Sequence, residues 1–155
     1  MEFTKPKVVD AEIVKSPVVL VESPYRDGDR RRNLRYLAWC ESDASVLGEL
    51  PIASHGNCTA YWPEDDEHRA KGFAWRDIVR KFCDYVVSYV DLGTSEGQRS
   101  AQQRDVRARV PGEWVERRLP SHLMVKFNVG EYPPGSMRRV PAEHLGRDFV
   151  SMFRG

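Results

Sequence analysis

The chain has few cysteines, no long apolar run and almost no charge imbalance. Its three cysteines, Cys40, Cys58 and Cys83, are odd in number and lack the paired spacing of metal sites. This argues against a disulfide framework or a zinc site and favours a reducing compartment. No apolar run approaches the length of a membrane span, and residues 1–16 lack the apolar core of a signal peptide. We therefore expect a soluble cytoplasmic protein with no membrane partner and no metal.

The balance of positive and negative charge also limits the classes of partner that the chain is expected to bind. Lysine and arginine total 24 against 23 aspartate and glutamate, for a net charge of +1, which gives no general electrostatic attraction for a polyanion. The run Arg30-Arg31-Arg32 is basic, but such a run at a helix start is usually solvated, and Asp27 or Asp29 can pair with it. We expect no nucleic-acid partner. At 155 residues and 41% hydrophobic content, the chain suits one core and one domain.

Segments with strand and helix patterns alternate along the chain. The apolar runs predict strands at 18–22, 50–55, 85–90 and 114–119, and the helical spacing predicts helices at 34–47, 65–82 and 95–109. This order predicts an α/β fold with a parallel sheet and right-handed crossovers.

Other segments carry weaker patterns. Residues 1–17 are expected to form an N-terminal arm, 123–129 a fifth strand, 131–137 a loop and 141–153 a closing helix. The helix at 65–82 has an apolar face that is expected to pack on the core, made of Ala70, Phe73, Ala74, Ile78 and Phe82.

The most informative stretch runs from Cys83 to Gln98. It predicts a buried central strand that ends at Asp91, a turn at Gly93, and a helix that Thr94 or Ser95 can cap. In open α/β sheets, ligands bind outside the carboxyl ends of the strands, where new helices present unpaired N–H groups. Glu96 is therefore expected to face a ligand crevice, although a carboxylate in a first helical turn is also explained by the helix dipole alone.

These segments together resemble a known family. The strand end at Glu22, the loop Ser23-Pro24-Tyr25-Arg26, Asn33, the segment 51–55 and the segment 91–97 are similar to the nucleoside 2-deoxyribosyltransferase-like superfamily, and most of all to its small members common in phages and actinobacteria. The resemblance covers residues 18–119. It implies a flavodoxin-like (Rossmann-like) single domain with helices on both faces at 18–120, and an extension at 121–155 that packs on the same domain.

The resemblance implies an N-glycosidic bond hydrolase or transferase that acts on a nucleoside or nucleoside 5′-monophosphate without a cofactor. Glu96 would be the nucleophile and Asp91 would orient it or a sugar hydroxyl, because a carboxylate stabilises an oxocarbenium-like centre and then bonds to it. The expected substrate-binding residues are Ser23, Pro24, Tyr25, Arg26, Asn33, His55, Gly93, Thr94 and Ser95. Arg26 would contact a phosphate, and His55 would contact the base or relay a proton, although a histidine in such a position more often has a purely structural role, which the residues alone favour here.

The chain departs from the family pattern at one place. In many members the catalytic glutamate follows a Ser-x-Gly segment by about one helical turn, and here Ala101 and Gln102 stand at that point. Two alternatives therefore stay open: a glycohydrolase of an NAD-type dinucleotide, and a nucleotide-binding protein without catalysis. The family resemblance and the aromatic loop at Tyr61-Trp62 also predict a homo-oligomer, a dimer or larger.

Overall fold

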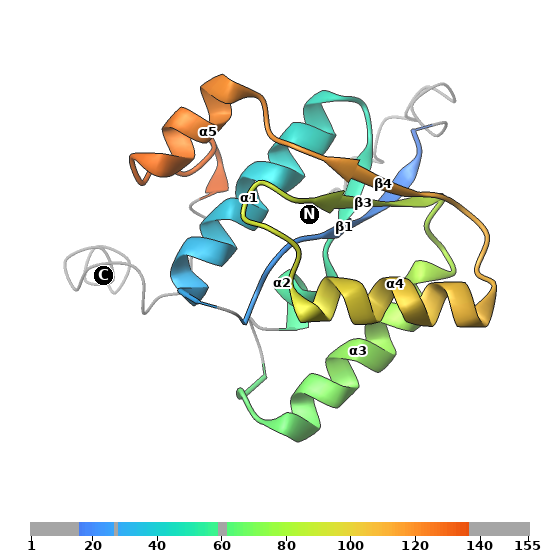
Figure 1. Ribbon diagram of the computed structural model, residues 1–155. Coiled ribbons are helices and arrows are strands. Elements are labelled where there is room, and N and C mark those ends of the chain that lie inside the picture. Colours follow the sequence, from blue (N-terminus) through green and yellow to red (C-terminus); the bar gives the residue numbers. More distant parts are fainter. Residues whose placement is uncertain (1–15, 27, 59–61, 137–155) are drawn as a thin grey trace, which may run out of the picture.

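Four parallel strands form the sheet in the computed structural model, which describes residues 16–26, 28–58 and 62–136 (Figure 1). The strands are β1 (Val18–Glu22), β2 (Leu50–Ile52), β3 (Tyr85–Tyr89) and β4 (Trp114–Arg117), in the order β2-β1-β3-β4. Each neighbouring pair is parallel, with Leu20 opposite both Ile52 and Val86. The predicted α/β flavodoxin-like fold with a parallel sheet is therefore confirmed.

The two central strands are apolar on both sides of the sheet. Val19, Leu20 and Val21 of β1 and Val86 and Val87 of β3 have no exposed surface. A continuous β-branched or aliphatic run suits a strand that is covered on both faces, which explains why the sequence pattern located these strands well.

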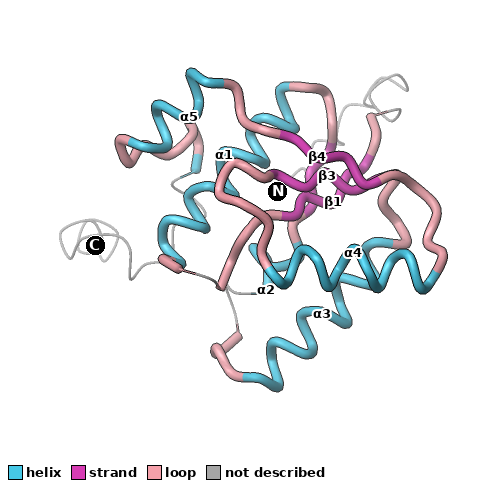
Figure 2. The backbone as a smooth tube through the Cα atoms, in the orientation of Figure 1, coloured by secondary structure: helices cyan, strands magenta, loops and turns pink. Residues whose placement is uncertain are grey.

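Five helices of the described chain cover the sheet (Figure 2). They are α1 (Arg30–Val46), α2 (Ser54–Cys58), α3 (Asp66–Arg80), α4 (Glu96–Ala108) and α5 (Ser121–Asn128). Helices α1 and α5 lie on one face, above the sheet in Figure 1, and α3 and α4 lie on the other. None of the helices in the described ranges is both long and apolar enough to span a membrane.

The face under α1 and α5 holds most of the apolar core. Tyr36 and Cys40 of α1 pack against Val21 and Val87 of the sheet and against Phe127 of α5. The Phe127 ring lies 5.5 Å from that of Tyr36, so helix α5 is joined to the body of the domain by a buried aromatic pair.

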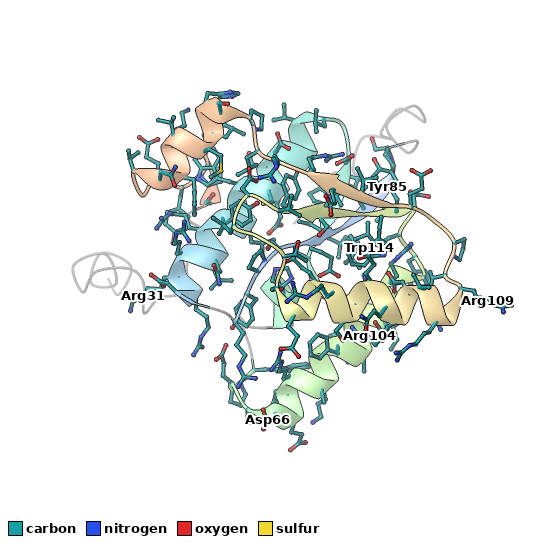
Figure 3. All side chains as sticks on the ribbon, in the orientation of Figure 1. Arg31, Asp66, Tyr85, Arg104, Arg109 and Trp114 are labelled. Atoms are coloured by element: carbon teal, nitrogen blue, oxygen red, sulfur yellow. The ribbon has the colours of Figure 1, made fainter. Side chains whose placement is uncertain are left out.

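The face under α3 and α4 is held by buried charges. Arg76 and Arg80 of α3 are 3% and 1% exposed, and both donate to the carboxylate of Asp105 on α4. The indole N–H of Trp114 donates to the same carboxylate at 2.9 Å, and Figure 3 shows Trp114 between the sheet and α4. Burial raises the pKa of Asp105, but its hydrogen bonds and ion pair with Arg76 outweigh this, and the net pKa lies below the ordinary value. This carboxylate therefore stays ionised and pairs with both guanidinium groups.

Three predictions about the elements were wrong. Residues 123–129 are mostly in helix α5 and not in a strand, because Leu123, Met124 and Phe127 share one helical face toward α1. Strand β2 stops at Ile52, and His55 lies in α2. The arm at 1–15 and the closing helix at 141–153 lie outside the described residues.

The third wrong prediction concerns the apolar face of α3. Ala70, Ala74, Ile78 and Phe82 are exposed, and Phe73 is partly buried. The buried side of the helix instead carries Arg76 and Arg80. Their ion pairs with Asp105 lie beside a small apolar cluster on this face, in which Val79 of α3 packs against Leu20 and Val86 of the sheet.

Removing the shared carboxylate should destabilise the whole domain. Asp105→Asn leaves the buried Arg80 without a carboxylate and leaves Arg76 with Glu22 as its buried anion, and we expect a loss of about 3 kcal/mol in the free energy of unfolding, measured by urea denaturation. Glu67→Gln is the matched control, because Glu67 pairs with Lys71 on the same helix at a site where its side chain is 74% exposed. We expect less than about 1 kcal/mol there. Equal losses in both variants would contradict a central role for Asp105.

Candidate functional site

A cavity opens at the carboxyl edge of the sheet, where the chain leaves β1 and β3 in opposite directions. Strand β1 leads to α1 and the edge strand β2, while β3 leads to α4 and β4. This reversal is the usual position of a ligand site in doubly wound sheets. The cavity has a volume of about 160 Å³, and residues from the end of β1, from α2, from α3 and from the start of α4 line it.

Glu22 is the buried carboxylate of this cavity. It is 8% exposed, and its Oε1 accepts a hydrogen bond from Arg76 Nε at 2.7 Å. Burial raises the pKa of Glu22 above its ordinary value, and the Arg76 guanidinium opposes that rise. Among the described residues, no hydrogen bond reaches the other oxygen, Oε2. Arg76 thus fixes one oxygen of Glu22 and leaves the second for a ligand.

Ser23 and His55 form a second polar pair on the cavity wall. The distance between Ser23 Oγ and His55 Nε2 is 3.1 Å, and the ring of Tyr25 lies 6.0 Å from the imidazole. Burial lowers the pKa of His55 to about 4. The ring is therefore neutral at pH 7, where it can accept or donate a hydrogen bond but carries no proton to give away as an acid.

Aromatic and charged side chains form the outer wall. Tyr25 donates its hydroxyl hydrogen bond to Glu64, and Arg30 pairs with the same carboxylate. Burial and the Glu64 carboxylate raise the pKa of Tyr25 to about 12, so this hydroxyl stays protonated. The rings of Trp62 and Phe73 also line this wall. The mouth of the cavity therefore combines flat apolar surface with groups that recognise an anion or a hydroxyl.

The N-terminal end of α4 forms part of the cavity wall. Ser95 Oγ accepts from Gln98 N at 3.2 Å, and Gln98 Oε1 accepts from Ser95 N at 2.8 Å, which makes a capping box. The Gln98 amide also donates to Ser88 Oγ and to the Tyr89 carbonyl of β3. Gln98 is thereby fixed to both the strand and the helix, and it holds Ser95 at the cavity.

The structure brings five of the predicted site residues to the cavity and leaves the others elsewhere. Those that line it are Ser23, Tyr25, Arg26, His55 and Ser95, whereas Pro24, Asn33, Asp91, Gly93, Thr94 and Glu96 are not among its lining residues.

The residues away from the cavity have other surroundings. Asp91 Oδ2 accepts from the Tyr36 hydroxyl at 2.6 Å and from Leu119 N at 2.9 Å, so this carboxylate joins three segments of the chain. Asn33 donates to the Tyr25 carbonyl at 2.9 Å and holds the β1–α1 loop. Glu96 is exposed in the first turn of α4.

Sequence reasoning missed Glu22, Phe73, Arg76 and Gln98 as lining residues. Gln98 carried a usable signal, because Ser95 followed three residues later by glutamine is the pattern of a capping box. Glu22 also carried one, since a charged residue at the end of a buried strand needs a reason to be there. Arg76 carried none, because its partners Glu22 and Asp105 lie 54 and 29 residues away.

No group of three or more histidine, cysteine, aspartate or glutamate side chains within residues 16–26, 28–58 and 62–136 is arranged to hold a metal ion.

The lowered pKa of His55 predicts a specific pH dependence of stability. The unfolded chain binds this proton near pH 6.5 and the folded chain only near pH 4, so stability is lost as pH falls between those values. His55→Asn should remove that part of the loss. Urea denaturation of the wild type and of His55→Asn between pH 4 and 7 tests this prediction. If the free energy of unfolding falls equally with pH in both proteins, His55 is not held neutral in the folded state.

Comparison with known proteins gives one match. Residues 17–114, more than half of the chain, match the model of a domain of unknown function, DUF7768. No curated protein and no solved structure matches the chain. The matched region contains β1, β2 and β3, the first residue of β4, and every residue that lines the cavity. The chain therefore belongs to the DUF7768 family.

Proposed function

We propose that the cavity binds a nucleoside or a nucleoside 5′-monophosphate and that the protein cleaves its N-glycosidic bond, by hydrolysis or by transfer to a second base. The observation that carries this proposal is the carboxylate of Glu22, which lines the cavity with Oε1 bonded to Arg76. A carboxylate at the switch point of the sheet is placed where a ligand binds in such folds, and a carboxylate can serve as the nucleophile at an anomeric carbon.

In this proposal Glu22 Oε2 attacks the anomeric carbon of the sugar. The bond between that carbon and the base nitrogen breaks, the base leaves with the electron pair, and solvent supplies the proton that it takes up. Water or a second base then attacks the same carbon and releases Glu22. Arg76 holds Oε1 throughout, so the carboxylate keeps its orientation during both displacements.

The cavity wall offers matching contacts for the rest of such a ligand. The rings of Tyr25, Trp62 and Phe73 supply flat apolar surface on which a base can stack. Arg26 and Arg69 also line the cavity, and a guanidinium group makes charge-assisted hydrogen bonds to a phosphate. The Arg26 side chain is 53% exposed and its distance to Asp66 is 3.8 Å, so it is free to turn toward a ligand.

Two carboxylates compete for the role of nucleophile. Glu96 has the position along the chain that the resemblance suggests, while Glu22 has the burial, the arginine partner and the place in the cavity. We favour Glu22, because Glu96 is exposed and outside the cavity lining, and an exposed carboxylate gains little from the electrostatic environment of a site.

A pair of variants separates these two carboxylates. Glu22→Gln keeps the hydrogen bond to Arg76 but loses the negative charge, so we expect release of free base to fall by on the order of a hundredfold or more while the ligand still binds. Glu96→Gln serves as the matched control and should leave the rate within about twofold. The measurement is chromatography of released base from a panel of nucleosides, monophosphates and dinucleotides. A larger loss of base release in Glu96→Gln than in Glu22→Gln would instead identify Glu96 as the nucleophile.

A second candidate function is binding without cleavage. The position one helical turn beyond Ser95-Glu96-Gly97 is Ala101, which is 2% exposed and lines the cavity. Because the side chain of Ala101 is a methyl group, helix α4 has no carboxylate at this position. Calorimetric binding of a nucleotide by a protein that releases no base from any member of the panel would favour this candidate. Free nicotinamide as the product would instead favour a dinucleotide substrate.

Arg26 should separate phosphorylated from unphosphorylated ligands. Arg26→Ala removes a charge that can contact a 5′-phosphate, so we expect binding of monophosphates to weaken by about tenfold and binding of the parent nucleosides to stay unchanged. Titration calorimetry with a matched nucleoside and monophosphate measures both. The control is Arg99→Ala, since Arg99 donates to the Thr94 carbonyl and does not line the cavity. An equal loss of affinity for the nucleoside and the monophosphate would show that Arg26 does not recognise the phosphate.

A further inference from the structure

Gly72 stands in the middle of helix α3, on the side of the helix that lines the cavity. The cavity-lining residues of this helix recur at helical spacing and are His68, Arg69, Gly72, Phe73 and Arg76. After proline, glycine is the least favourable residue in a helix interior, because its backbone loses the most freedom on folding. A glycine at the centre of a helix of 15 residues therefore calls for a physical reason.

Neither the backbone nor the packing of the described chain supplies that reason. Gly72 is not one of the glycines with a positive φ, so other residues can adopt its conformation. A Cβ atom at Gly72 would meet no heavy atom of the described residues within 4 Å, whereas one at Gly56 would lie 3.0 Å from the Leu37 side chain. What the glycine at position 72 provides is open space on the cavity wall.

Aromatic side chains border this open space on two sides. The centre of the Trp62 ring lies 5.7 Å from that of His68 and 5.1 Å from that of Trp75. Because these two residues come four before and three after Gly72, Trp62 lies along one flank of Gly72. Phe73 is the next residue, about 100° further round the helix, and lies on the other flank. The open space is thus placed between two aromatic side chains.

The cavity runs along α3 from Glu22 past this space. Arg76, one helical turn after Gly72, donates to Glu22 Oε1 at 2.7 Å. Of the described residues of α3, none after Arg76 lines the cavity. A ligand with its anomeric carbon at Glu22 therefore extends toward the start of the helix, and Gly72 lies about 6 Å from Arg76 along the axis. The base is bonded on the side of that carbon away from the carboxylate, so its far edge reaches Gly72.

We propose that Gly72 makes the cavity selective for a purine base, whose second ring lies against the helix backbone at Gly72 between Trp62 and Phe73. A flat second ring fits this space and gains stacking contact with the aromatic side chains. A pyrimidine has one ring and leaves the space to water. This inference rests on the proposed binding of a nucleoside or nucleotide, but not on its cleavage.

Gly72→Ala tests the proposal, because it should change stability and binding in opposite directions. Alanine favours the helix and its methyl group meets no atom of the described chain, so the midpoint of thermal unfolding should rise by about 2 to 4 °C. The methyl group takes space from the second ring. Titration calorimetry should therefore give about tenfold weaker binding of adenosine 5′-monophosphate and its deoxy form, and unchanged binding of the two cytidine counterparts.

A larger side chain extends the series and has a matched control. Gly72→Leu should abolish binding of the adenosine monophosphates, because its side chain fills the space. Ala74→Leu places the same side chain on the same helix, at an exposed position outside the cavity lining, and should leave binding unchanged. Circular dichroism should show the wild-type spectrum for both variants.

The possible results separate this inference from the proposed cleavage. An equal loss of adenosine and cytidine affinity in Gly72→Ala would overturn the inference, since the space would then take the sugar. Unchanged affinity for both, or a wild type that binds no purine nucleotide, would also overturn it. So would a lower unfolding midpoint, because the fold itself would then need the glycine. A wild type with the expected binding pattern that releases no base would support the inference and contradict the cleavage alone.

Discussion

The ion network around Asp105 is the interaction on which the rest of this structure depends. One carboxylate on α4 accepts from two arginines of α3 and from the indole of Trp114 on β4. Arg76 extends the network to Glu22 at the end of β1, so the cavity floor and the packing of both helices share the same contacts. The Arg80 guanidinium also donates to the Pro111 carbonyl before β4, at 2.9 Å. Helix position, strand position and cavity shape are therefore coupled through a few charged groups.

The two faces of the sheet are built on different physical principles. Under α1 and α5, apolar side chains exclude water and the polar groups among them are tyrosine hydroxyls paired with carboxylates, such as Tyr89 with Asp43. Under α3 and α4, the apolar cluster around Leu20 and Val86 is smaller, and directional hydrogen bonds between buried charges join the helices to each other and to the sheet. Charge pairs fix geometry more strictly than apolar contacts do, and the cavity with its buried Glu22 lies on this second face.

Much of the fold could be predicted from the sequence, because the signals were local. Continuous apolar runs identified β1 and β3, and the segment from Gly93 to Ser95 identified the turn and the start of α4. The orientation of α3 could not be predicted, because the partners of Arg76 and Arg80 are distant in the sequence and a charged residue on a helix is usually solvated. For the same reason the sequence pointed to Glu96, beside a strong local motif, while the cavity contains Glu22. Whether either carboxylate acts on a substrate stays a prediction.

The shared carboxylate also limits how this protein can evolve. Replacing Asp105 leaves Arg80 without a carboxylate, and replacing Arg76 leaves Glu22 without its arginine, so a fully apolar replacement of the network needs several simultaneous substitutions. Each single step on that path produces a less stable protein. The inward side of α3 is thus closed to gradual mutational drift, while its outward side can vary one residue at a time.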